Sequence, residues 1–130
     1  MTDTGTTFTV ETDRRTQVVD ITERVAAALP EDATGTATVF VRHTTVGVTV
    51  NEAESRLLSD FESFLESAVA DEGWQHDQLD GNADSHLRAL LCGPSETVPV
   101  TDGRLDLGTW QSVLVVECDG PQSRTVEIRV

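Results

Sequence analysis

Short runs of β-branched residues, closely spaced along the chain, constrain its fold more than any other feature. Valine, isoleucine and threonine favour strands, and alternating apolar and polar residues have the period of a strand with one buried face. Residues 35–44, GTATVFVRHT, place Val39 and Val41 on one face. Phe40 and Arg42 then lie on the other face. Strand-like runs also lie at residues 7–13, 17–22, 46–52, 96–108 and 112–130.

Turn residues between these runs predict how the strands connect. We expect residues 17–22 to continue the strand at 7–13 or to pair with it. Asp102 and Gly103 predict a turn between two short strands. Residues 111–130, QSVLVVECDGPQSRTVEIRV, are typical of a hairpin that turns at Asp119 to Ser123.

Helical spacing is confined to a few segments. Residues 55–70 have the clearest pattern, with apolar residues three and four positions apart and acidic residues between them. A short helix is expected at residues 20–29, and another from about residues 82–85 to Leu91. The chain of 130 residues has the size of one domain. The sequence therefore predicts a single α+β domain, a mainly antiparallel β-sandwich with two to three helices.

The charge of the chain excludes some classes of partner. Asp and Glu number 23 against nine basic residues, all arginine, which gives a net charge of −14. Like charges repel, so we expect neither nucleic acid nor an anionic membrane as a partner. The acidity fits a basic partner or, since the acids are spread along the chain, adaptation of the whole surface to high salt.

Targeting features and cysteine chemistry point to the cytoplasm. The N-terminus lacks the basic start and apolar core of a signal peptide, and no apolar run is long enough to cross a bilayer. Cys92 and Cys118 are not spaced as a CxxC pair. Both lie among apolar residues, which favours buried thiols over metal ligands or a nucleophile.

Three histidines are the candidate metal ligands. His43, His76 and His86 lie at expected strand ends or loop–helix junctions, each beside a hydroxyl or carboxylate residue. Taken singly, each is explained as an ordinary structural histidine. Together, three imidazoles suit zinc with an open fourth position, or another divalent transition metal. Bound phosphates would instead favour magnesium.

Residues 77–95, DQLDGNADSHLRALLCGPS, have more polar groups than a helix cap needs. Asn82, Asp84 and Ser85 are all good N-cap residues, yet a helix uses only one. Free amides at this helix start, with Arg88 one turn along, would suit a phosphate. The nearby carboxylates repel a phosphate unless a cation intervenes. The segment therefore indicates either a metal-bridged phosphate or no phosphate at all.

Other candidate site residues lie on the strands and the loop near the C-terminus. Glu117, on an apolar strand, is a candidate acid or base, and if buried it needs a partner such as Arg or His. Trp110 is either a core anchor or a platform for a flat ligand whose polar edge Gln111 reads. Basic groups suited to phosphates are Arg42, Arg88 and Arg104.

Several motifs, in order, resemble those of one known family. They are His43-Thr-Thr, Val48-Thr-Val-Asn-Glu52, Trp74-Gln-His76-Asp77, Gly81-Asn-Ala-Asp-Ser-His86-Leu-Arg88, Gly93-Pro-Ser95, Asp102-Gly-Arg104, Gly108-Thr-Trp-Gln111 and Glu117-Cys-Asp-Gly-Pro121. This order is similar to that of the YjbQ-like family, also described as secondary thiamine-phosphate synthase. The resemblance extends over nearly the whole chain.

The resemblance implies a compact α+β sandwich that forms a homotrimer, with motif histidines lining a pocket near a subunit interface. It implies weak thiamine-phosphate synthesis, in which a thiazole phosphate nitrogen displaces pyrophosphate from a hydroxymethylpyrimidine diphosphate. A non-catalytic metal- or metabolite-binding trimer is the alternative. The motif positions fall on His43, His76, Asn82, Asp84, His86 and Glu117.

Overall fold

The computed structural model describes residues 5–130, which form two antiparallel sheets that share one core. The first sheet has five strands in the order β1-β8-β3-β5-β6, and the second has three in the order β2-β7-β4. The strands are β1 Thr6–Glu11, β2 Gln17–Asp20, β3 Gly35–Val41, β4 Val46–Asn51, β5 Ser95–Thr101, β6 Arg104–Leu105, β7 Ser112–Glu117 and β8 Ser123–Arg129.

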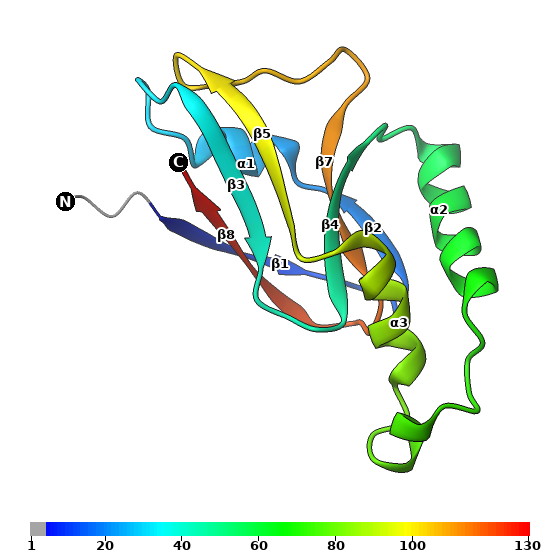
Figure 1. The fold of residues 1–130 in the computed structure, drawn as a ribbon. Coiled ribbons are helices and arrows are strands. Elements are labelled where there is room, and N and C mark those ends of the chain that lie inside the picture. The colour runs from blue at the N-terminus through cyan, green and yellow to red at the C-terminus, as the bar shows by residue number, and fades with distance from the viewer. Residues whose placement is uncertain (1–4) are drawn as a thin grey trace.

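Three α-helices and one 3-10 helix complete the fold: α1 Thr22–Ala27, α2 Ser55–Ala68, η1 Gln75–Gln78 and α3 Ala83–Cys92. Figure 1 shows α2 and α3 together beside the three-stranded sheet, with η1 in the connection between them. The predicted α+β class with antiparallel sheets and helices is confirmed. In residues 5–130, no helix is both long enough and apolar enough to cross a membrane.

The core lies between the two sheets and consists mainly of valine. Val39 and Val126 of the five-stranded sheet are fully buried, as are Val48 and Val115 of the three-stranded sheet. Burying one such side chain stabilises the fold by about 1.5 kcal/mol. The predicted faces of β3 are confirmed, because Val39 is buried while Phe40 on the opposite face is 37% exposed.

The predicted pairings of consecutive strands are wrong in two places. β7 pairs with β2 and β4, whereas β8 pairs with β1 and β3, so residues 111–130 do not form a hairpin. β1 and β2 also belong to different sheets. At each place the chain crosses from one sheet to the other, so that both strands turn their apolar face to the same core. The turn at Asp102 and Gly103 is confirmed, with φ angles of 51° and 77°.

The helices are held on the sheet by local features of the sequence. Gly47 in β4 lets α3 approach, because a Cβ atom at this position would lie 2.6 Å from the Cβ atom of Cys92. Glu54 caps α2, accepting hydrogen bonds from the backbone amides of Arg56 and Leu57. Asn82 precedes α3 but makes no such side-chain cap, which leaves its side chain available for other contacts.

Candidate functional site

Two of the three histidines are in direct contact. His76 lies in η1 and His86 in the first turn of α3. Their ring centroids are 5.0 Å apart and their planes are nearly perpendicular, at 86°. The short loop between the two helices therefore brings together two imidazoles that are ten positions apart in the sequence.

His86 lies between two adjoining hollows on the surface, which we call the histidine hollows. The first has a volume of about 270 Å³ and the second about 320 Å³. Residues lining the first are Trp74, His76, Ala83, His86 and Leu87. Residues lining the second are His43, Thr44, Val46, His86, Ala89, Leu90, Gly93 and Pro94. His86 is the residue common to both, so the three histidines lie along one continuous stretch of surface.

Two buried polar atoms near the first hollow have no hydrogen-bond partner within residues 5–130. They are Nε2 of His76 and Oδ1 of Asn82. The nearest acid to the imidazole, Asp80, has its Oδ2 atom 3.6 Å from Nε2, too far for a hydrogen bond. The Asn82 amide nitrogen donates to Asp119 at 3.1 Å, so only its oxygen is unpaired. Since buried polar atoms are nearly always paired, these two mark a place where a ligand or water is expected.

His43 is held differently from the other two histidines. Its Nε2 atom accepts a hydrogen bond from the backbone amide of Thr125 at 2.8 Å. Burial lowers the pKa of His43, and the positive charge of Arg124 lowers it further, against a smaller opposing effect of Glu117. The ring is therefore neutral at pH 7, with its proton on Nδ1.

The histidines of one chain do not fit a three-imidazole zinc site. In the described part of the chain, no three His, Cys, Asp or Glu side chains are grouped so that they could hold a metal ion. The Nε2 atom of His43 is already a hydrogen-bond acceptor, which removes it as a ligand. His76 and His86 alone provide fewer than the three protein ligands that zinc has in catalytic sites.

The polar residues at the start of α3 are turned inward. Asp84 and Ser85 are fully buried. Nη2 of Arg15 lies 2.8 Å from each carboxylate oxygen of Asp84 and 3.3 Å from the Ser85 hydroxyl. Arg88 donates to the same carboxylate from one turn along the helix. Asp84 is thus clamped between two guanidinium groups.

Arg88 is itself buried, with 2% of its surface exposed, and every part of its guanidinium is bonded. Nε donates to the carbonyl of Leu65 at 2.8 Å. Nη2 donates to the carbonyls of Glu66 and Val69 and to the Asp71 carboxylate. Burial lowers the pKa of Arg88, but the bonds with Asp71 and Asp84 outweigh it, so the net pKa is raised. Arg88 therefore joins α3 to the C-terminal end of α2, and all three nitrogens of its buried guanidinium already donate within the protein.

Glu117 is fully buried and paired with Arg124, which is also buried. Its carboxylate also accepts from the Thr12 hydroxyl at 2.7 Å and from the Asp119 backbone amide at 3.0 Å. Burial raises the pKa of Glu117, but these hydrogen bonds, with Arg124 first, bring it below the usual value. Glu117 is therefore an ionised partner of Arg124. This is one of the two outcomes expected for a buried glutamate on this strand.

The remaining predicted site residues lie outside the histidine hollows. Arg42 pairs with Glu127 on the outer face of the five-stranded sheet. Trp110 is 72% exposed, so it is not a core anchor. The side-chain oxygen of Gln111 accepts a hydrogen bond from the backbone amide of Gly108 at 2.8 Å, which closes the turn between these two residues. Arg104 is exposed on the short strand β6. Roles for these residues in binding stay predictions.

Two arginines of this region were not singled out from the sequence. Arg15 and Arg124 hold the buried carboxylates of Asp84 and Glu117. Neither belongs to a recognisable motif, and the partner of Arg15 is far away in the sequence. The one available signal was the need of a buried acid for a cation, which does not say which arginine provides it.

Comparison with known proteins agrees with this architecture. The family model described as UPF0047 protein YjbQ-like matches residues 6–130. A UPF0047 protein of Methanothermobacter thermautotrophicus is 48% identical over 124 residues, covering 93% of this chain and 87% of its own. YugU of Bacillus subtilis, also a UPF0047 protein, is 35% identical over 130 residues and covers 95% and 96%.

Solved structures show the same fold. A hypothetical protein of Aeropyrum pernix has a TM-score of 0.91 and 45% identity, covering 95% of both chains. A protein of Sulfolobus solfataricus described as YbjQ-like and of unknown function has a TM-score of 0.82 and 32% identity, covering 95% of this chain and 93% of its own. On the family match and these identities, the chain belongs to the UPF0047 protein YjbQ-like family.

Proposed function

We propose that this protein binds a small phosphorylated metabolite in the histidine hollows and catalyses a weak thiamine-phosphate synthase reaction there. The observation that carries the proposal is the pair of unsatisfied buried atoms, Nε2 of His76 and Oδ1 of Asn82, beside the imidazole of His86. Each unpaired atom costs about 1–3 kcal/mol, which a ligand that bonds to it would recover. The activity itself is suggested by the family resemblance.

The two unpaired atoms suit different parts of the proposed substrate. Oδ1 of Asn82 is only an acceptor, so it requires a donor such as the amino group of the pyrimidine ring. The ring N–H groups of His76 and His86 donate hydrogen bonds to a diphosphate. In the reaction, the thiazole nitrogen forms a bond to the pyrimidine methylene carbon. The carbon–oxygen bond breaks, and pyrophosphate leaves with the electron pair.

The acidic residues have a supporting role in this proposal. Glu117 was a candidate acid or base and Asp84 a motif position implied by the family resemblance, but both are fully buried in ion pairs with arginine. Their ion pairs fix the start of α3 and the end of β7, while the imidazoles stabilise the charge of the leaving pyrophosphate. Magnesium, which is often bound through substrate phosphates, fits this arrangement better than a resident zinc. It would enter as the complex of the diphosphate substrate.

A second candidate is a non-catalytic metabolite-binding homotrimer. It is favoured by the same ion pairs, because no free carboxylate is left among the predicted catalytic residues. The homotrimer follows from the family resemblance alone. Sedimentation equilibrium at high salt tests it, and a species three times the mass of the 14.1 kDa chain is expected.

The experiment incubates the purified protein with both precursors and magnesium and measures thiamine phosphate by chromatography. We expect product from the wild type and from the control Thr97→Ala on the exposed face of β5. His86→Ala should reduce the rate by about 100-fold, the lower end for loss of an acid–base group. No product above the His86→Ala level would refute catalysis. If diphosphate still binds to the wild type but not to His86→Ala, the binding candidate holds.

A further inference from the structure

Helix α2 leaves much of its apolar face uncovered. Its apolar residues are spaced for packing on the three-stranded sheet, yet Leu65 is its only fully buried residue. Phe64, which lies on the same apolar face of α2, is 61% exposed. An amphipathic helix normally buries its apolar face against the core. The incomplete burial here means that something besides the sheet has room to pack against α2.

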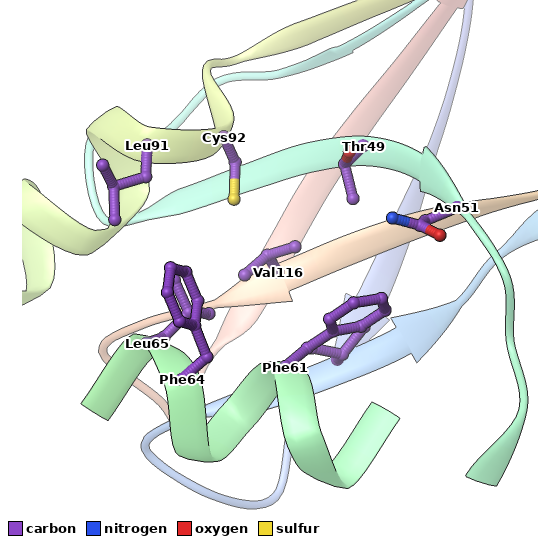
Figure 2. Close-up of a pocket in the computed structure, with 9 residues that line it drawn as sticks. Thr49, Asn51, Phe61, Phe64, Leu65, Leu91, Cys92 and Val116 are labelled. Carbon is purple, nitrogen blue, oxygen red and sulfur yellow. The ribbon is translucent and has the colours of Figure 1, made fainter. Parts of the chain in front are cut away.

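The uncovered face forms one wall of a half-open apolar hollow of about 170 Å³. Figure 2 shows Phe61, Phe64 and Leu65 of α2 on one side and the end of α3 on the other. Val18 of β2 and Val116 of β7 also line it. A space of roughly 150 Å³ is enough for a molecule as large as benzene. This hollow therefore has room for one aromatic ring with a small substituent.

Polar atoms occur at the edge of the hollow rather than in its floor. Asn51 uses its side-chain oxygen to accept the backbone amide of Glu52 at 2.8 Å. In Figure 2 its side-chain nitrogen lies on the side that faces the hollow. The sulfur of Cys92 also points inward. The hollow thus offers polar groups, the Asn51 amide and the Thr49 hydroxyl, at the edge of an aromatic and aliphatic space, and the Asn51 nitrogen is the donor that faces it.

Charge restricts the ligand further. No lining residue is charged at neutral pH, because burial and the charge of Glu96 raise the pKa of the one ionisable group, the Cys92 thiol. No lining carboxylate is present to hold a cation, and the net charge of −14 opposes an anion. The ligand is therefore neutral.

We infer that the hollow between α2, α3 and the three-stranded sheet is a second binding site, for a neutral aromatic molecule that carries a carbonyl or similar acceptor. The ring packs between the side chains of Phe61, Phe64 and Val116, and the acceptor takes the hydrogen bond of Asn51. The site is separate from the histidine hollows and shares no lining residue with them. It thus stands whether or not the proposed function holds.

Two nearly isosteric probes, acetophenone and isopropylbenzene, test the inference. Each is titrated into the ¹⁵N-labelled protein, and backbone amide shifts are followed by NMR. We expect saturable shifts at Asn51, Phe64 and Cys92 with a Kd of about 1 mM, typical of such small ligands. Asn51→Ala should weaken acetophenone by about fivefold and leave isopropylbenzene unchanged. His86→Ala should change neither.

Variants of the walls locate the site. Leu91→Trp places a large ring at the mouth, where Leu91 is 58% exposed, and should weaken both probes by at least about fivefold. Leu90→Trp is the matched control, since Leu90 is the neighbour of Leu91 in the chain but lines the second histidine hollow instead. Phe64→Ser removes a wall without filling the space and should also weaken both.

Three results would overturn the inference. The first is the absence of saturable shifts in the wild type. The second is equal affinity of Leu91→Trp, Phe64→Ser and Leu90→Trp for both probes. The third is a probe that binds only after an oligomer has been dissociated, by dilution or by Leu91→Trp. In that case a second copy of the chain, and not a small ligand, covers the apolar face of α2 in the wild type.

Discussion

Replacement of Arg88 by alanine tests the central claim that this residue is part of the structure and not part of a phosphate site. The substitution removes the donors that join Asp84, the Asp71 carboxylate and the end of α2. It leaves the fully buried carboxylate of Asp84 with Arg15 as its one cationic partner. We therefore expect the free energy of unfolding to fall sharply.

The expected fall in the free energy of unfolding is the sum of contributions from the partners that Arg88 loses. Breaking a buried ion pair by removing one partner costs about 3–5 kcal/mol. The bond that Arg15 keeps with Asp84 places the expected loss toward the lower end. Asp71, whose side chain is 79% exposed, regains water and adds little. The carbonyls of Leu65 and Val69 are at a helix end, where water replaces part of what is lost. The expected loss is about 3–4 kcal/mol.

Urea denaturation followed by circular dichroism at one fixed, high salt concentration measures this loss. Arg88→Lys retains the charge but not the planar set of donors, so we expect it to cost about 1–2 kcal/mol. Combining Arg88→Ala with Asp84→Ala should cost less than the sum of the two, with a coupling energy of about 2 kcal/mol. Arg104→Ala, on the surface, is the control and should stay within about 0.5 kcal/mol of the wild type.

The reasoning would be refuted by a loss below about 1 kcal/mol for Arg88→Ala, or by additive effects of Arg88→Ala and Asp84→Ala. Either result would mean that the carboxylate is not buried against this guanidinium in solution. A folded and stable Arg88→Ala protein that no longer binds diphosphate would return Arg88 to the phosphate site.

Three further predictions follow from individual contacts. The pKa of His43 is lower in the folded than in the unfolded chain, so the unfolded chain takes up the proton first and stability should fall as pH drops below about 6.5. Urea midpoints measured from pH 8 to pH 5 should show this loss for the wild type but not for His43→Gln. Midpoints of the two proteins that fall in parallel with pH would contradict it. Burial raises the pKa of Cys118 to about 12, so iodoacetamide at pH 8 should modify the half-buried Cys92 first, and mass spectrometry showing equal labelling would count against this. Gly47→Ala should cost about 1–3 kcal/mol, because its Cβ atom would meet Cys92, and an unchanged melting temperature would disprove the close approach.

The helices and the buried faces of strands were predictable, but strand partners were not. The period of two in β3 fixes which side chains are buried, and the structure confirms this for Val39 and Val41. The same period says nothing about which strand lies alongside. β7 and β8 follow each other closely, and a hairpin is the usual result. In a two-sheet fold either partner buries the same apolar face, so only the packing of the whole chain decides.

The part of the candidate site that could be predicted consists of the histidines and of the polar residues in excess at residues 77–95. The contact between His76 and His86 follows from a short loop between two helices. The roles of Asp84 and Glu117 depended on which arginine reached them. Arg15 approaches Asp84 from the segment between β1 and β2, which is distant in sequence. Sequence patterns do not contain this information, because any of nine arginines satisfies the same electrostatic need.

The distribution of satisfied and unsatisfied polar groups separates structural from functional residues in this region. Asp84 and Glu117 have a structural role that needs no ligand, because each is buried in an ion pair with a buried arginine. His76 and Asn82 are the opposite case, since each keeps a buried atom without a partner in residues 5–130. A fold gains nothing from such atoms and loses about 1–3 kcal/mol for each. Their position beside His86 is therefore a place where a ligand or an ordered water is expected, and the proposed function assigns it to a ligand.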